Sequence, residues 1–162
     1  MKMSEGIEWS LHCCTVLGSL PPGVALPGAR LAEFHDVPPA YLGKQLQRLA
    51  RAGIVESVAG RKGGFRLGRA AAEITLLDVV EAIEGTAPAF RCTEIRQQGP
   101  SAIGRRHYVK PCGIAAAMHR AEDAWKAELR AVTVADLLAE LETGVDIRQT
   151  DKAITWLTEV LT

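Results

Sequence analysis

The sequence is poor in aromatic residues and contains no long hydrophobic run. Aromatic side chains make up 5% of its 162 residues although 48% are hydrophobic, so we expect an aliphatic core of packed helices. No apolar stretch approaches the roughly 18–20 residues that a membrane-spanning helix requires. The first residues also lack the apolar segment of a secretion signal, because Glu5 and Glu8 interrupt it.

Cysteine is scarce as well. The chain has four cysteines, and the absence of a secretion signal predicts a cytoplasmic protein. In that reducing compartment cysteines are more typical of ligands, redox groups or core residues than of a disulfide framework.

The sequence has no net charge, but its charges are unevenly distributed. Between Pro38 and Arg69 it contains seven basic residues and one acid, Glu56. Between Thr133 and Thr162 six acidic residues accompany two basic ones. Because a local basic surface governs phosphate binding, the first half of the chain remains compatible with binding to nucleic acid.

Three helices are expected near the start of the chain. The spacing of apolar residues predicts them over residues 4–20, 28–35 and 39–52. Gly53 suits the end of the third helix. The apolar stripe of that helix is expected to consist of Leu42, Leu46 and Leu49.

A β-hairpin and a capped helix follow. Residues 54–58 and 65–67 have the composition of strands, and the basic, glycine-rich segment between them is typical of a hairpin turn. Thr75 and Asp78 have the spacing of a capping box, so a helix is expected from there to Gly85. This order indicates a mainly α fold with a winged helix-turn-helix.

One face of the third expected helix has side chains suited to reading DNA. Four residues recur on it at i, i+3, i+4 and i+7, namely Tyr41, Lys44, Gln45 and Arg48. At the expected hairpin tip, Arg61 and Lys62 can reach a groove or the phosphate backbone. A solvated basic helix beside an ordinary hairpin has the same composition, but the whole order of elements favours double-stranded DNA as the partner.

The rest of the chain predicts a long irregular segment and then more helices. A helix is expected from near Cys112 to Ala131, another after Thr133, and an amphipathic helix in the tail. A long loop in a compact domain is usually functional or disordered. The expected organisation is a DNA-binding domain, a cluster-binding loop, a dimerisation helix with its successor, and a tail, over residues 1–85, 86–112, 113–142 and 143–162.

Two stretches of the sequence resemble a known family. They are YLGKQLQRLARAGIVESVAGRKGGFRLGR and, soon after it, EITLLDVVEAIEG. Together they resemble the Rrf2 family of bacterial transcription regulators, over about residues 5–140. The resemblance implies a homodimer with winged helix-turn-helix domains, a long dimerisation helix and binding to partly palindromic operators. For many members it also implies an iron–sulfur cluster in the loop before that helix.

The chain departs from the family in this loop, where cluster-binding members usually have three closely spaced cysteines. It has two there, Cys92 and Cys112. A [2Fe–2S] cluster needs four protein ligands, and histidine can replace some of the thiolates. The other candidates are Glu94 and His107 in the loop, and Glu8, His12, Cys13 and Cys14 near the N-terminus.

Glu8 and His12 form the second candidate pair, since they project from one helical face about one turn apart. In the family, this helix of one subunit is expected near the loop of the other. The chain therefore resembles a branch in which a redox-sensing [2Fe–2S] cluster is held by Cys92 and Cys112 of one chain and by Glu8 and His12 of the other. Trp9 is then a candidate for redox-coupled movement. The alternatives are that Glu8 and His12 form an ordinary surface pair, or that His107 replaces one of them.

These observations predict a transcription regulator, and more specifically a repressor, controlled by the redox state of the cluster. One alternative is a cluster-free regulator of the same family that senses through cysteine thiols or a small ligand. Another is a small zinc hydrolase using the same four candidate ligands. The basic hairpin and the lack of a nucleophile or general-base motif argue against that enzyme, so we expect no enzymatic activity.

Overall fold

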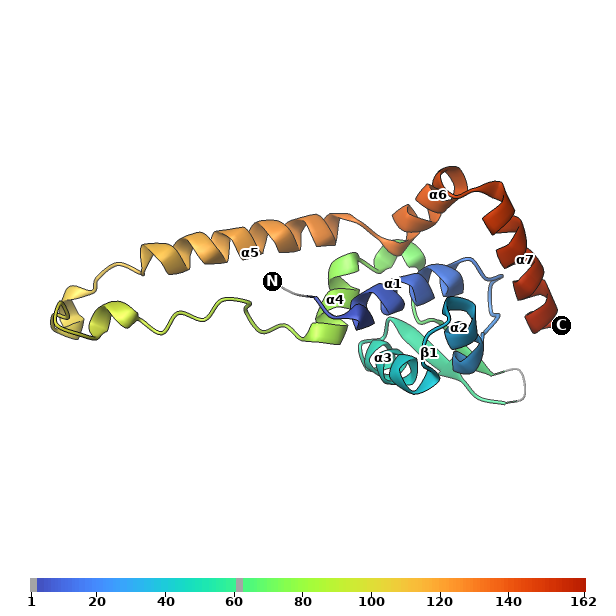
Figure 1. The fold of residues 1–162 in the computed structure, drawn as a ribbon, viewed down its shortest axis with the longest axis horizontal. Helices are drawn as coiled ribbons and strands as arrows, with labels where there is room; N and C mark the ends of the chain where they lie inside the picture. Colours follow the sequence, from blue (N-terminus) through green and yellow to red (C-terminus); the bar gives the residue numbers. More distant parts are fainter. Residues whose placement is uncertain (1–2, 61–62) are drawn as a thin grey trace.

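The computed structural model describes residues 3–60 and 63–162. It is mainly helical, with a small two-stranded sheet, and a long arm projects from a compact helical domain (Figure 1). The mainly α fold class expected from the sequence is confirmed. Within the described residues, no helix is long and apolar enough to cross a membrane.

The first three helices are α1 (Glu5–Gly18), α2 (Gly28–His35) and α3 (Pro39–Arg51). α2 ends at Asp36, whose left-handed φ of 50° turns the chain towards α3. The apolar stripe expected on α3 is confirmed, because its three leucines are almost completely buried, Leu42, Leu46 and Leu49.

The first helix is shorter than predicted. It ends at Gly18, whereas the prediction extended it to residue 20, directly before Pro21. Leu20 precedes Pro21, and a residue before proline is disfavoured in the helical conformation. The proline therefore ends the helix before the residue that directly precedes it.

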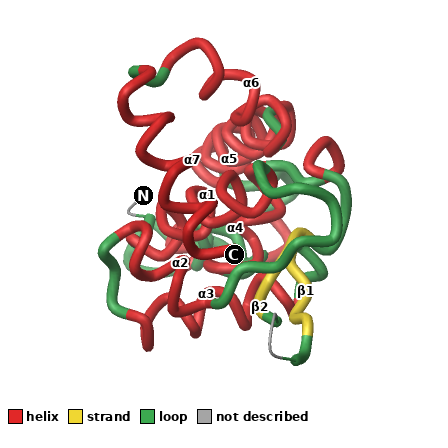
Figure 2. Tube along the Cα trace, turned by 90° about the vertical axis from the view of Figure 1, so that its right-hand side faces the viewer, coloured by secondary structure: helices red, strands yellow, loops and turns green. Residues whose placement is uncertain are grey.

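The wing is an antiparallel hairpin of β1 (Val55–Val58) and β2 (Gly64–Leu67), with Val55 opposite Leu67. Figure 2 shows it at the edge of the helical domain. Gly64 has a φ of 154°, and a Cβ there would lie 2.4 Å from the carbonyl oxygen of Leu26. Glycine therefore permits the two backbone hydrogen bonds of 2.9 Å that join Leu26 to Phe65.

α4 (Leu76–Glu84) begins with the predicted capping box. The N–H of Asp78 donates to Thr75 Oγ1 over 3.1 Å, and the N–H of Thr75 donates to Asp78 Oδ2 over 2.9 Å. Gly85 ends the helix with a φ of 87°. Both features expected of this helix are confirmed.

Residues 86–112, named here the cysteine arm, lead away from the domain, and α5 (Gly113–Ala131) returns to it (Figure 1). The arm is irregular apart from short 3₁₀ turns, Ile95–Gln97 and Arg105–His107. The apolar side chains of Ile114 and Met118 on α5 are 70% and 44% exposed. An apolar helix side of this kind is typical of a helix–helix interface.

The chain ends in α6 (Val134–Gly144) and α7 (Ile147–Leu161). α6 packs closely on the end of α1, since a Cβ at Gly18 would lie 2.9 Å from the Leu138 side chain. α7 folds back to α2, where Trp156 meets Phe34 edge to face with ring centroids 5.1 Å apart. The predicted tail helix is confirmed, and its apolar side contributes to the core of the DNA-binding domain.

Candidate nucleic-acid interface and metal ligands

α3 presents a polar surface to solvent. Of the four residues predicted to read DNA, Tyr41, Lys44 and Arg48 are exposed. Gln45 is half-buried and lies against α1, because a Cβ at Gly6 would lie 2.8 Å from its side-chain nitrogen. The structure therefore places Gln45 at the junction of two helices.

Arg48 also contacts the domain, since its Nη1 donates to the carbonyl oxygen of Ile83 in α4 over 3.0 Å. Helical geometry places three exposed residues opposite the buried leucines of α3, namely Lys44, Gln47 and Arg51. The sequence-based prediction missed Gln47 and Arg51. Projecting the helix from its leucine stripe would have found both of them.

Two aromatic rings join α1 to the exposed end of α3. Trp9 is half-buried and meets Tyr41 edge to face, with ring centroids 6.5 Å apart and an interplanar angle of 88°. The Lys44 ammonium lies 5.4 Å from the centre of the Tyr41 ring. Trp9, which follows Glu8 in the sequence, therefore contacts Tyr41 of the predicted DNA-reading surface.

The hairpin has one described ion pair, between Arg66 and Glu56. Arg66 therefore has its charge partly balanced within the sheet. Arg61 and Lys62, predicted to act at the hairpin tip, lie outside the described residues.

Glu8 and His12 are both exposed on α1. They line an open hollow of about 420 Å³ together with other residues of the N-terminal segment, namely Met3, Ser4, Glu5, Ile7 and Leu11. The ring of His35 in α2 lies 5.5 Å from the ring of His12. Burial, and then the charge of His12, lowers the pKa of His35, so His35 favours the neutral imidazole.

In the cysteine arm, the hydrogen bond with Glu94 is the main cause that raises the pKa of the Arg96 guanidinium, and the charges of Glu94, Cys112 and Cys92 raise it further. Cys112 precedes α5, and the backbone N–H of Ala115 is the main cause that lowers the pKa of its thiol. The backbone N–H of Glu94 donates to Cys92 Sγ over 3.4 Å. The thiol pair predicted from the sequence therefore shares one charged environment.

The remaining candidates are separate from this pair. His107 is exposed and its Nε2 accepts a hydrogen bond of 3.3 Å from Arg106. Cys13 and Cys14 are fully buried in α1, and burial raises the pKa of each thiol to about 12. Within the described ranges, no three histidine, cysteine or acidic side chains are arranged to hold a metal ion. The α1 pair and the arm pair are therefore not united within one chain.

Comparison with known proteins gives the family. The family model for Rrf2, described as an iron-dependent transcriptional regulator, matches residues 3–140. The chain belongs to the Rrf2 family. The resemblance inferred from the two sequence stretches is thus confirmed, and α7 lies beyond the matched part.

Comparisons with individual proteins support the same family assignment and fold. YwgB of Bacillus subtilis, named as an HTH-type transcriptional regulator, is 30% identical over 151 residues, which are 93% of each chain. The structure of CymR (YrzC), the global cysteine regulator of B. subtilis, matches with a TM-score of 0.68 at 22% identity and covers 86% of this chain and 97% of its own. T. potens IscR matches with a TM-score of 0.68 at 19% identity, over 90% and 93% of the two chains. Both structural likenesses establish the fold.

Family membership and the winged helix-turn-helix define the general activity. This Rrf2 protein is a DNA-binding transcription regulator, as its relatives are, and not an enzyme.

Proposed function

We propose that this Rrf2 protein is a homodimeric repressor whose binding to a partly palindromic operator is controlled by the redox state of a [2Fe–2S] cluster. Cys92 and Cys112 of one protomer and Glu8 and His12 of the other are the ligands in this proposal. A regulator of chromosomal DNA would act in the cytoplasm. The proposal is supported by one observation: Glu8 and His12 line one hollow on α1, Cys92 and Cys112 belong to the cysteine arm, and no three candidate ligands come together in the described part of one chain.

The donor set has the right chemistry for such a cluster. Iron–sulfur clusters are held by thiolates, and histidine can replace some of them. The lowered pKa of Cys112 favours the thiolate that binds metal. Glu8 and His12 are exposed beside an open hollow, so a partner's arm can reach them without displacing core side chains.

Dimerisation supplies the missing half of each site. The exposed apolar side of α5, with Ile114 and Met118, supports pairing of two chains through this helix. A dimer also suits DNA, because two recognition helices about 34 Å apart can read both halves of a palindrome.

When bound, a [2Fe–2S] cluster supplies a reversible one-electron change in charge. Glu8 and His12 flank Trp9, and Trp9 packs on Tyr41 of α3. A movement of α1 can therefore reach the recognition helix through this aromatic pair, besides the packing of Gln45 on Gly6. Carboxylate and imidazole are weaker ligands for an iron–sulfur cluster than thiolate and are released more readily, which makes α1 the mobile side of this arrangement.

A second candidate is a cluster-free regulator that senses through thiols or a small ligand. It is favoured by the half-exposed Cys92 thiol and by a pocket of about 200 Å³ between α4 and α5. Trp125 and Val80 line this pocket and would supply apolar contacts to a ligand.

The first experiment is to purify the protein anaerobically and measure its visible absorption, iron and sulfide. The wild type is compared with four single variants, Glu8→Ala, His12→Ala, Cys92→Ala and Cys112→Ala. A [2Fe–2S] spectrum that is changed or lost in each variant supports the mixed ligand set. Colourless, iron-free wild type would overturn it and favour the second candidate.

A heterodimer tests whether the two pairs come from different chains. One chain contains Glu8→Ala with His12→Ala, and the other contains Cys92→Ala with Cys112→Ala. If ligands come from both chains, this heterodimer keeps one intact site and about half the iron of the wild type, while each doubly substituted homodimer keeps none. Ligands from a single chain would leave the heterodimer empty too.

A further inference from the structure

Glu94 is the carboxylate that lies beside Cys92. The Cys92 thiol lies 3.7 Å from Glu94 Oε1 and can donate to it. Glu94 also has a left-handed φ of 49°, which is uncommon for a residue other than glycine. Its carboxylate is therefore a competitor of Glu8 for a metal site at the two cysteines.

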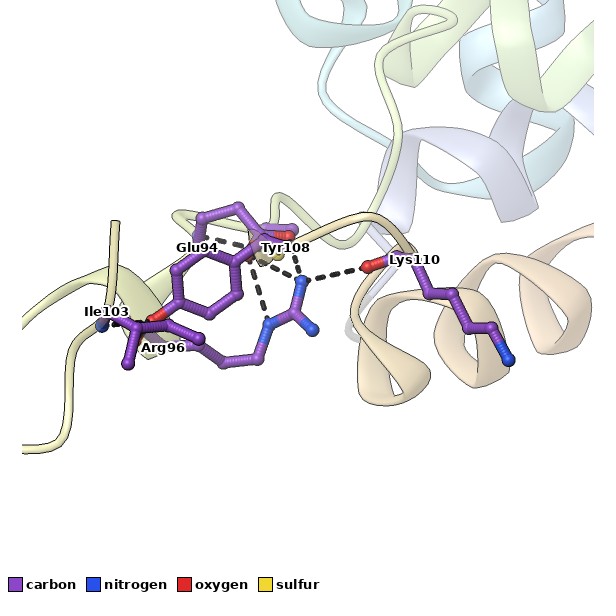
Figure 3. A network of polar contacts seen from close by, with 6 residues as sticks. Glu94, Arg96, Ile103, Tyr108 and Lys110 are labelled. Atoms are coloured by element: carbon purple, nitrogen blue, oxygen red, sulfur yellow. Dashed lines mark hydrogen bonds and ion pairs between the residues drawn. The ribbon is translucent and has the colours of Figure 1, made fainter. Parts of the chain in front are cut away.

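Arg96 forms an ion pair with that carboxylate. Its Nη2 donates to Glu94 Oε2 over 2.7 Å and to Oε1 over 3.0 Å, and its Nε donates to Oε2 over 3.1 Å (Figure 3). Both oxygens of Glu94 are engaged by one planar guanidinium, a geometry that lysine cannot reproduce. The charge of Glu94 is thereby balanced by that of Arg96, and both of its oxygens accept hydrogen bonds.

Arg96 also joins the two legs of the cysteine arm, which are residues 92–96 with Cys92 and residues 108–112 with Cys112. Its Nη2 donates to the carbonyl oxygen of Lys110 over 3.4 Å, and its own carbonyl accepts from the Tyr108 hydroxyl over 2.5 Å. The Tyr108 ring stacks on the guanidinium at 5.3 Å, and its hydroxyl accepts from the N–H of Ile103 over 3.1 Å. These contacts connect the leg with Cys92 to the leg with Cys112.

We propose that Arg96 is the positioning residue that selects the carboxylate ligand: it sequesters Glu94 and fixes the two legs of the arm, so that the remaining ligand positions are left to the partner's Glu8 and His12. This inference rests on the proposed function. It explains why a site with a carboxylate beside Cys92 nevertheless depends on a second chain, and hence why cluster binding is coupled to dimer geometry.

The test is a rescue experiment on the full-length protein, assembled with iron and sulfide under anaerobic conditions. Glu8→Ala is expected to lose cluster. Glu8→Ala with Arg96→Ala is expected to regain iron several-fold, because Glu94 is released, and adding Glu94→Gln is expected to remove it again. Arg105→Ala, which changes an exposed arginine of the same arm, is the matched control and is expected to give no rescue.

A second measurement uses metal-free protein. Hydrogen exchange in the two legs, residues 92–96 and 108–112, is expected to become roughly two- to fivefold faster in Arg96→Ala, the change that loss of a partly exposed ion pair produces, and to stay unchanged in Arg105→Ala. No rescue together with unchanged exchange would overturn the role of Arg96 while leaving a Glu8-dependent cluster intact. A wild type that binds no cluster would overturn the proposed function, and the ligand selection with it.

Discussion

Trp9 of α1 and Tyr41 of α3 form an edge-to-face pair that links the candidate ligand helix to the recognition helix, with ring centroids 6.5 Å apart. Glu8 precedes Trp9 directly, and Lys44 lies over the Tyr41 ring. The position of the Trp9 side chain therefore affects both the helix of the candidate ligand Glu8 and the predicted DNA-reading surface.

Loss of this pair is expected to weaken operator binding even without metal. Aromatic pairs contribute about 0.5–1.5 kcal/mol beyond their buried area, so Trp9→Ala is expected to lower operator affinity roughly two- to tenfold in metal-free protein. Trp9→Phe, which keeps an aromatic ring, is expected to retain most of the affinity. Fluorescence anisotropy with labelled operator measures both, and equal affinities of the wild type and Trp9→Ala would disprove the link.

The exposed stripe of α3, formed by Lys44, Gln47 and Arg51 opposite the buried leucines, leads to a second prediction. Lys44→Ala is expected to reduce operator affinity about tenfold or more, as loss of a base contact does. Arg51→Ala is expected to act through phosphates and to reduce the dependence of log affinity on log salt by about one unit. Lys152→Ala in α7 removes an exposed positive charge far from α3 in sequence and serves as the control. The stripe is misassigned if all three variants bind alike over a range of salt concentrations.

The helices, the hairpin and the caps of this fold were predictable from sequence because local signals determine them. The Thr75 capping box and the buried leucines of α3 are examples. The packing of Gln45 on Gly6 was not predictable, because it depends on the angle between α1 and α3. The same holds for Trp156 on Phe34, which are separated by most of the chain.

The family resemblance contributed to the prediction of the candidate ligands. The structure adds the spatial neighbours of these residues, which the sequence alone does not reveal. Arg96 joins the two legs of the cysteine arm only through its contacts with Lys110 and Tyr108. His35 lies beside His12 only because α2 packs on α1. His35 is distant in sequence from His12, so no local pattern identifies that pair. Arg96 follows Glu94 by two residues, and only its contacts with Lys110 and Tyr108 are long-range.

The cysteines are expected to differ in reactivity. Cys13 and Cys14 are fully buried, with the pKa of each raised to about 12, so native metal-free protein at pH 8 is expected to protect both from iodoacetamide. The half-exposed Cys92 is expected to react first. Peptide mass mapping before and after denaturation measures the order, and early labelling of Cys13 or Cys14 would contradict it.

The same two thiols predict a loss of stability at alkaline pH. In the unfolded chain a thiol ionises near pH 9, whereas in the folded chain it stays protonated to about pH 12. The unfolded state therefore binds fewer protons in this window, so stability is retained below pH 9 and falls as pH rises towards 12, by on the order of 1 kcal/mol per thiol at pH 10. Urea unfolding from pH 7 to 10 measures the decline. The decline is expected to be shallower in Cys13→Ala with Cys14→Ala, and equal slopes would contradict the assignment.

The docking of α7 on α2 is expected to stabilise the DNA-binding domain. Trp156 is half-buried and packs on Phe34, so Trp156→Ala is expected to lower the free energy of unfolding by about 1–2 kcal/mol and to speed hydrogen exchange throughout α7. Ile154→Ala, whose side chain is 57% exposed on the same helix, is the matched control and is expected to change stability by less than about 0.5 kcal/mol. Because Phe34 also contacts His35 at 4.9 Å between ring centroids, and His35 in turn lies beside His12, release of α7 is expected to loosen the candidate ligand helix as well. Faster exchange confined to α7, with α1 and α2 unchanged, would show that the tail stabilises only itself.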